Sequence, residues 1–257
     1  MNFEYLTLEK DGAIARITLR RPECANALSL ALMREITTAA NSFKFDTATR
    51  VVLIAGEGRH FCSGADLKDK ERWQVNEEGD LLARTRLTQL GRDLLDAILG
   101  INQVTIAAIQ GAAAGGGACI ATACDFRIGS SDCRAGYPEV KLGMNLSWGA
   151  LPLCYNLVGP AISKRMVIGG ELENADDLLA WGFLDEVVKP ERLLTRAEEL
   201  ARYYAQRPPM AAQMIKRGIN ALQAIGDRTM HMDGDQYSLA TMSDEFKQAR
   251  AKFSGKS

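Results

Sequence analysis

The sequence predicts an α/β protein, because a strand–helix–strand pattern occurs twice along the chain. Ala15, Ile17 and Leu19 alternate with polar residues, which is the period of a half-buried strand. A helical pattern follows, and the apolar run at 51–55 then predicts a second strand. The same alternation returns between 104 and 128, so we expect one α/β core.

The first predicted helix begins after Ser29, a residue type that caps helices well. Apolar residues then recur at steps of three or four, as expected for a helix with one buried face. They are Leu32, Ile36, Ala40 and Phe43.

The region 67–100 changes character along its length. It starts with charged residues, and Leu87, Leu90, Leu94 and Ile98 then lie on one helical face. We therefore expect a mobile lid at 69–86 that passes into a helix.

The segment 104–124 has no charged residue and is long enough to cross a bilayer. Gly111 and the run 115–117 would break a spanning helix, so the pattern favours a strand at 104–109, a glycine turn and a helix to about 123. A strand at 126–128 follows. Glycines between a strand and a helix leave amide donors open to negative oxygen, although close helix–strand packing explains them equally well. Neither the phosphate-loop nor the dinucleotide spacing is present.

After Pro190 the pattern is helical, with stretches at 192–205 and 210–225 and a polar tail to Ser257. We predict a core of residues 1–190 and a helical region of residues 191–257. The helical region is expected to pack on the core or on another subunit.

Composition narrows the possible functions. The 257 residues carry 31 Lys and Arg against 32 Asp and Glu, so no nucleic-acid or membrane partner is expected. Six cysteines without a CxxC pair, and a first segment unlike a leader, predict a reduced, cytoplasmic protein. The only histidines are His60 and His231, so no metal site is expected. We interpret His60 as structural and place His231 near a subunit contact.

A second loop of small residues, at 58–68, follows the strand at 51–55. Together with the glycines at 115–117 it could direct two backbone N–H groups at one oxygen atom. That arrangement stabilises an enolate or a tetrahedral oxyanion.

With two such loops at 58–68 and 115–117, the chain resembles the crotonase superfamily, the enoyl-CoA hydratase/isomerase family. The resemblance extends over nearly its whole length. Each matching piece is short, but seven of them occur in order. They are Arg21-Pro22 with Asn26-Ala27-Leu28, then 61–67, Ile109-Gln110-Gly111 with 115–117, Cys124-Asp125, Pro138-Glu139, Leu142-Gly143, and Trp181-Gly182 before Val187-Val188.

The resemblance implies a crotonase-like spiral of β-β-α turns, with a C-terminal helical region that forms a homotrimer or a dimer of trimers. It implies an acyl-CoA substrate in fatty acid metabolism, with coenzyme A as part of the substrate and no separate cofactor. The oxyanion donors would be the amides of Ala65 and Gly116. The coenzyme contacts would be Ala25 beside the adenine, with Ser63, Ala65, Asp66, Leu67 and Lys68, and with Phe253 and Lys256 reaching a neighbour's coenzyme. Glu23 stands where some members have a phosphate-binding lysine.

The resemblance also places Glu139 at the position that moves the proton, whereas a surface carboxylate is the plain alternative. Hydratases of the family pair two glutamates twenty residues apart, and the earlier position here is Cys119. An unperturbed thiol is a poor partner for water, so Cys119 is expected to pack as a small apolar residue. One carboxylate is enough for double-bond isomerisation, which we therefore favour.

Cys119, Tyr137 and Trp148 are expected to line the acyl pocket. Ser147 and Trp148 replace small residues of hydratases, so Trp148 forms either an aromatic wall or ordinary core.

Several alternatives stay open from the sequence. Hydration remains possible if Asp66, Glu71 or another lid residue supplies a second acid or base. Glu139 could instead activate water for acyl-CoA hydrolysis, whereas a Cys119 nucleophile lacks an identifiable base. A non-catalytic acyl-CoA binder or an RNA-binding protein is the non-enzyme alternative, but residues 69–86 interleave acids with bases.

Overall fold

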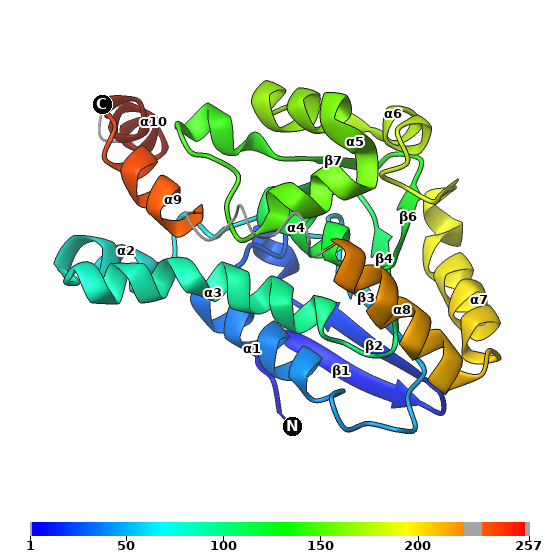
Figure 1. Ribbon diagram of the computed structural model, residues 1–257. Coiled ribbons are helices and arrows are strands. Elements are labelled where there is room, and N and C mark those ends of the chain that lie inside the picture. Colours follow the sequence, from blue (N-terminus) through cyan, green and yellow to red (C-terminus); the bar gives the residue numbers. More distant parts are fainter. Residues whose placement is uncertain (1, 224–232, 255–257) are drawn as a thin grey trace.

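The computed structural model describes residues 2–223 and 233–254, and a six-stranded sheet lies at its centre (Figure 1). The strands lie in the order β1-β2-β3-β4-β6-β9, and the pairs are parallel except for β1 with β2. They are β1 (Leu6–Asp11), β2 (Ile14–Leu19), β3 (Val51–Gly56), β4 (Val104–Ile109), β6 (Phe126–Ser130) and β9 (Glu186–Val188). The α/β core and its four predicted strands are confirmed; β1 and β9 are additional.

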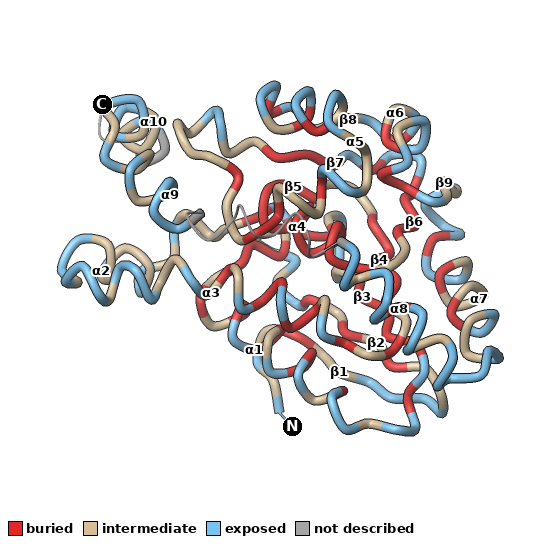
Figure 2. Tube along the Cα trace, in the orientation of Figure 1, coloured by how far each residue is buried: buried red, intermediate tan, exposed pale blue. Residues whose placement is uncertain are grey.

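Successive residues of β3 face opposite sides of this sheet, as the pleat requires. Val52 and Ile54 belong to the main apolar core, which includes α1 (Leu30–Asn41) and α3 (Leu81–Leu99). Leu53 and Ala55 pack in a second cluster with α7 (Leu193–Ala205). The sheet is therefore covered on both faces, and Figure 2 shows its buried strands between the helices. Ser29 caps α1 as predicted, since its Oγ accepts the Leu32 N–H at 3.2 Å.

A smaller sheet of three strands lies beside α4 (Gly116–Ala123). It consists of β5 (Ala112–Ala114), β7 (Arg134–Gly136) and β8 (Glu173–Asn174), with β5 and β7 parallel. The uncharged segment 104–124 is thus divided among β4, β5 and α4. Within the described ranges, no helix is long and apolar enough to cross a membrane.

The predicted lid at 69–86 consists of α2 (Lys70–Glu78) and the first turns of α3. Two aspartates begin these helices: Asp69 accepts amide N–H groups at the start of α2, and Asp80 does the same for α3. The helix expected around Leu87 therefore begins earlier, at Leu81. The charged stretch hid both helices because the early turns carry little apolar pattern.

Helices α5 (Ala150–Gly169) and α6 (Ala175–Ala180) complete the core region, together with 3-10 turns at Pro22–Cys24 (η1), Pro138–Leu142 (η2) and Pro190–Arg192 (η3). The helix α5 is broken at Gly159, whose φ of 74° is non-helical, and Pro160 follows directly. This interruption explains why the sequence pattern did not reveal the helix.

The described part of the chain after residue 190 consists of helices joined by short turns and has no strand, as predicted. It contains η3, α7, α8 (Pro209–Gln223), α9 (Asp233–Thr241) and α10 (Asp244–Ser254). Helices α9 and α10 lie near α2 and away from α7 (Figure 1). Helices α2, α9 and α10 are largely exposed (Figure 2). Arg250 of α10 stacks on the Trp73 ring of α2 at 4.1 Å and forms an ion pair with Glu77. The division between 1–190 and 191–257 stays a prediction.

Helix α8 is held to the core by a charge. Lys216 is 8% exposed, and its Nζ lies 2.7 Å from Asp125 Oδ2 and 2.8 Å from the Gln103 carbonyl oxygen. The opposite side of α8 exposes large apolar side chains. They are Met210, Met214, Ile215, Ile219 and Leu222.

Candidate active site

The loop after β3 runs between two other segments as an irregular strand. Cys62 forms a parallel bridge with Ala113 of β5, and Ala65 forms one with Leu28. Leu28 N–H donates to the Gly64 carbonyl at 2.7 Å, and the Asp66 N–H donates to the Leu28 carbonyl at 3.0 Å. These bonds fix the backbone on both sides of Ala65.

The same bonds set the direction of the Ala65 amide. In a trans peptide the C=O and N–H groups point in opposite directions. Because the Gly64 carbonyl points at Leu28, the Ala65 N–H points away from Leu28. Among the described residues this N–H has no acceptor.

Gly115 and Gly116 form the start of α4. Gly115 has φ +51°, a left-handed conformation that suits glycine. Its carbonyl accepts the Cys119 N–H at 2.9 Å, so the Gly116 N–H points out of the helix start. No described group accepts a hydrogen bond from this second amide either.

Close packing brings the two loops together. A Cβ atom added to Gly64 would lie 2.7 Å from the Ala114 carbonyl oxygen and 3.5 Å from the Gly116 nitrogen. A Cβ atom on Gly117 would lie only 2.2 Å from the Cys62 carbonyl oxygen. Glycines at 64 and 117 are therefore needed to place the Ala65 and Gly116 amides in one small region.

Glu139 adds a carboxyl group to this region. It lies in the turn η2, which begins with Pro138, and its Oε1 would be 2.9 Å from a Cβ atom on Gly115. Its Oε2 is buried and has no hydrogen-bond partner among the described residues. Burial raises the pKa of Glu139 to about 7. A carboxyl group with this pKa can exchange a proton near neutral pH.

Cys119 and Tyr137 are buried behind the two glycines. Cys119 is 1% exposed and packs in the main core. Tyr137 is fully buried, and its hydroxyl group lies 2.6 Å from Thr122 Oγ1. Burial raises the pKa of Tyr137 well above its usual value. Their assignment to the acyl pocket stays a prediction.

Trp148 lies across the site between two helices. A Cβ atom on Gly116 would be 2.6 Å from its Cζ3, and one on Gly91 of α3 would be 2.1 Å from its Nε1. The indole therefore fills the space between the start of α4 and the middle of α3. Trp148 itself has φ +66°, an uncommon conformation for a residue with a side chain.

The lid carboxylates that could assist hydration are engaged elsewhere. Asp66 Oδ2 accepts two bonds from the Arg21 guanidinium, each at 3.0 Å. Glu71 pairs with Arg34 through both of its oxygens, at 2.6 and 3.0 Å. In the described part of the chain, Glu139 is the carboxylate that the structure places beside the two loops without an ion pair.

The residues expected to contact coenzyme A divide into two groups. Ala25 and Ser63 are adjacent, since the Ser63 N–H donates to the Ala25 carbonyl at 3.0 Å. Leu67 lies next to the exposed Lys68, and its carbonyl accepts the Trp73 Nε1–H at 2.5 Å. Phe253 belongs to α10, but its side chain lies outside the described residues, as do Lys256 and His231 entirely.

His60 has a structural role in the first loop. Its Nδ1 accepts the Ala112 N–H at 3.1 Å, and its carbonyl accepts from the Asn26 side chain at 2.8 Å. Asn26 is fully buried and also bonds Arg21 and Glu57. These contacts hold the turn before Leu28 against the loop at 58–68.

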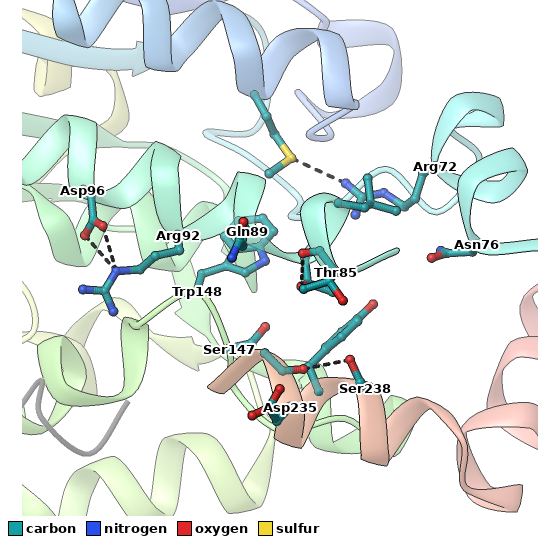
Figure 3. Close-up of a pocket in the computed structure, with 15 residues that line it drawn as sticks. Arg72, Asn76, Thr85, Gln89, Arg92, Asp96, Ser147, Trp148, Asp235 and Ser238 are labelled. Atoms are coloured by element: carbon teal, nitrogen blue, oxygen red, sulfur yellow. Dashed lines mark hydrogen bonds and ion pairs between the residues drawn. The ribbon is translucent and has the colours of Figure 1, made fainter. Parts of the chain in front are cut away.

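A cavity of about 470 Å³ opens beside Trp148, between α2, α3 and α9 (Figure 3). Its lining is rich in polar side chains, and Arg72 and Arg92 lie on opposite sides of it. Arg92 pairs with Asp96 at 2.8 Å, whereas Arg72 Nε is buried without a partner. Sequence reasoning missed Arg72, because it is one of five consecutive charged residues and nothing in that run marks it as inward-facing.

The whole chain is similar to known enzymes. The enoyl-CoA hydratase/isomerase family matches residues 9–257. A crotonyl-CoA hydratase of Syntrophomonas wolfei is 30% identical over 98% of this chain and 96% of its own. An enoyl-CoA hydratase/isomerase structure from Xanthobacter autotrophicus is 27% identical, covers 100% of this chain and 99% of its own, and has a TM-score of 0.82. An enoyl-CoA hydratase structure from Mycobacterium avium, 24% identical, shares the fold with a TM-score of 0.87 over 98% of this chain and 99% of its own. The expected crotonase fold is thereby confirmed, and the chain belongs to the enoyl-CoA hydratase/isomerase family.

Proposed function

We propose that this enzyme moves a proton on an enoyl-CoA thioester whose enolate is held by the Ala65 and Gly116 amides. Glu139 takes the proton from one carbon and returns it to another, so that the double bond shifts. The favoured reaction is therefore double-bond isomerisation. The observation that carries the proposal is the Glu139 carboxyl group beside Gly115, whose Oε2 is buried without a partner among the described residues.

The amides support an enolate for a physical reason. Removing the α-proton of a thioester places negative charge on its carbonyl oxygen, and fixed N–H donors stabilise that charge without reorganising. Ala65 and Gly116 have amides that meet no acceptor in the described protein. The loss of one such donor typically costs about 3 kcal/mol of transition-state stabilisation.

The tuning of Glu139 suits a group that both accepts and donates. A carboxyl group with a pKa of about 7 is easily deprotonated at neutral pH, yet it is basic enough to hold a proton during transfer. Each proton removed is given back, so no second acid is needed. Cys119 is buried, and Asp66 and Glu71 form ion pairs. A mechanism in which Glu139 is the single acid–base group is therefore the simplest.

Hydration is the second candidate, and the names of relatives favour it. The Syntrophomonas wolfei relative is a crotonyl-CoA hydratase, and a relative from Clostridium acetobutylicum is a short-chain-enoyl-CoA hydratase. Glu139 would then have to take a proton from water and afterwards donate a proton to the α carbon. This path predicts 3-hydroxyacyl-CoA as the product, which isomerisation does not form.

We also propose where the coenzyme lies. Ser63 and Lys68 are exposed on the loop that carries Ala65, and Ala25 is bonded to Ser63. A coenzyme along this rim would bring its thioester to the Ala65 amide. The Asp66 carboxylate would contribute indirectly, by holding Arg21 and the loop.

We propose self-association through α8, because the polarity of this helix is unusual. This helix turns Lys216 inward and turns Met214, Ile215 and Ile219 outward. An exposed apolar face of this kind marks an interaction surface. Its proposed occupant is another copy of this chain, in a trimer or a dimer of trimers, as the family resemblance implies.

The decisive experiment follows a 3-enoyl-CoA and a 2-enoyl-CoA in D₂O by mass spectrometry. We expect deuterium at the α and γ carbons and interconversion of the two isomers, with little 3-hydroxyacyl-CoA. Glu139→Gln is expected to lower exchange about 10²- to 10⁴-fold. Glu171→Gln, which alters an exposed glutamate paired with Lys141, is the matched control. Full exchange by Glu139→Gln would place the base elsewhere, and rapid hydration would select the second candidate.

A further inference from the structure

The cavity beside Trp148 contains a cation without a counter-ion. Arg72 has no carboxylate within ion-pair distance among the described residues. Its NH2 group makes two long contacts, 3.4 Å to the Leu28 carbonyl oxygen and 3.5 Å to Met33 Sδ. Its Nε is buried and unsatisfied. A guanidinium keeps its charge in proteins, so this group needs an anion or strong acceptors.

The acidic residues near Arg72 do not meet that need. Asp66 is bonded to Arg21. Asp69 uses its two oxygens on the amides of Leu30, at 2.6 Å, and of Glu71, at 3.0 Å. Across the cavity, Asp96 is paired with Arg92, and Asp235 at the rim is exposed. The guanidinium therefore lines the cavity without an ion pair of its own, while Asp66 and Asp69 keep their charges nearby but are bonded to other groups.

The rest of the lining offers both apolar and polar surface. The apolar part is formed by Met33, Leu87, Trp148 and Tyr237, which can pack against an acyl chain. Hydroxyl and amide side chains of α2, α3, α9 and the segment before α5 form the polar part, which suits a polar chain end. They are Asn76, Thr85, Thr88, Gln89, Ser147 and Ser238. The volume of about 470 Å³ is within the range of small-ligand pockets.

The cavity is close to the proposed reaction centre. Arg72 contacts the carbonyl of Leu28, the residue whose hydrogen bonds fix Ala65. Trp148 lines the cavity and also packs against Gly116. A thioester held at the two amides would therefore direct its acyl chain along Trp148 toward Arg72.

We propose that Arg72 selects acyl-CoA substrates whose acyl chain ends in a carboxylate. This inference rests on the proposed function, since it names the substrate class of the same site. The guanidinium binds the remote carboxylate with charge-assisted hydrogen bonds, which suit a planar two-oxygen acceptor. The substrate is thus the thioester of a short dicarboxylic acid.

The test compares saturated thioesters that bind without reacting. Glutaryl-CoA and adipyl-CoA are measured by calorimetry against pentanoyl-CoA and hexanoyl-CoA, which have the same chain lengths without the carboxylate. We expect at least one carboxylated ligand to bind ten times more tightly or better. Arg72→Met should remove that advantage and leave the uncharged ligands within about twofold, whereas Arg72→Lys should retain part of it. Arg84→Met, which alters an exposed arginine of α3 outside the cavity, is the control.

Each other result has a distinct meaning. Equal binding of charged and uncharged ligands by the unaltered enzyme overturns the inference and leaves the proposed function intact. An equal loss for all four ligands in Arg72→Met places Arg72 against the coenzyme phosphates, because all four carry the same coenzyme, and this also overturns the inference. If none of the thioesters binds, the proposed function fails with it.

Discussion

Glu139 Oε1 lies beside Gly115, 2.9 Å from the position that a Cβ atom of residue 115 would occupy. The carboxyl group therefore rests against bare backbone, one residue before the Gly116 amide. This contact makes the position of the base depend on the absence of a side chain at 115.

Gly115→Ala tests that dependence. The new methyl group displaces the Glu139 carboxyl, and we expect kcat to fall by about 10²-fold, since small misplacements have such effects. The backbone of residue 115 (φ 51°, ψ −118°) is one that alanine rarely adopts, which adds about 1–3 kcal/mol of destabilisation. Gly182→Ala is the matched control, because Gly182 also has positive φ but has nothing within 4 Å of its added Cβ. Similar activity losses in the two variants would refute a specific contact with Glu139.

The raised pKa of Glu139 predicts a pH dependence of turnover. A base must be deprotonated, so kcat/KM should rise tenfold per pH unit below about pH 7 and level off above it. Rates measured from pH 5 to 9 with a non-ionising thioester check this expectation. An activity that stays constant down to pH 5 would assign the base to a group of lower pKa.

The same group predicts a pH dependence of stability. Its pKa is raised in the folded state, so unfolding releases its proton between the ordinary value of 4.5 and about 7. The free energy of unfolding should therefore fall as pH rises through this window, by at most about 3 kcal/mol. Glu139→Gln should remove that part of the slope in urea titrations at several pH values. An unchanged slope in the variant would contradict burial as the cause.

Cys119 is expected to be a packing residue. Cys119→Ala should retain most of the isomerase rate and lose about 1 kcal/mol of stability, because a small buried group is removed. Iodoacetamide should not label the native thiol at a rate that matches inactivation. A variant that folds with its usual thermal midpoint but loses turnover would revive a chemical role for this sulfur.

Trp148 is expected to limit the acyl group. Trp148→Leu opens space between Gly91 and Gly116, so kcat/KM should rise for branched or longer acyl chains relative to short ones. Trp181→Leu is the control, since that indole stacks on Arg165 at 4.7 Å, away from the candidate site. An unchanged substrate order would make Trp148 ordinary packing.

The exposed face of α8 predicts the effect of charge on assembly. Met214→Glu with Ile219→Glu should lower the molecular mass measured by light scattering, because an apolar contact cannot accept two buried carboxylates. Phe45→Glu, at an apolar residue that is 87% exposed elsewhere, should leave the mass unchanged. A single mass for all three proteins would refute the proposed surface.

Sequence patterns predicted the large elements because their residues carry strong periodicity. The run at 51–55 and the stripe after Ser29 became β3 and α1. The short strands β5 and β7 escaped notice, since Ala and Gly leave no alternation to detect. Pro160 and Gly159 similarly obscured α5.

The candidate site was likewise predictable from the sequence only in part. The family resemblance assigned roles to Ala65, Gly116 and Glu139, because these residues lie in the short motifs that carry it, and those roles stay predictions. Arg72 was not found, since a charge turned inward and one turned outward look alike in a run of charged residues. Its orientation is decided by distant partners, Leu28 and Met33 on one side and the cavity on the other.

Trp148 is followed by Gly149, and both have positive φ, 66° and 70°. Two successive residues with positive φ turn the chain into α5, and packing against Gly91 and Gly116 then holds the indole. A residue with a side chain keeps such a backbone conformation only where several surrounding contacts hold it in place. We therefore expect the ring to act as a fixed wall that selects ligands by shape, and redesign of the enzyme for new thioesters should start with positions 91 and 148 together.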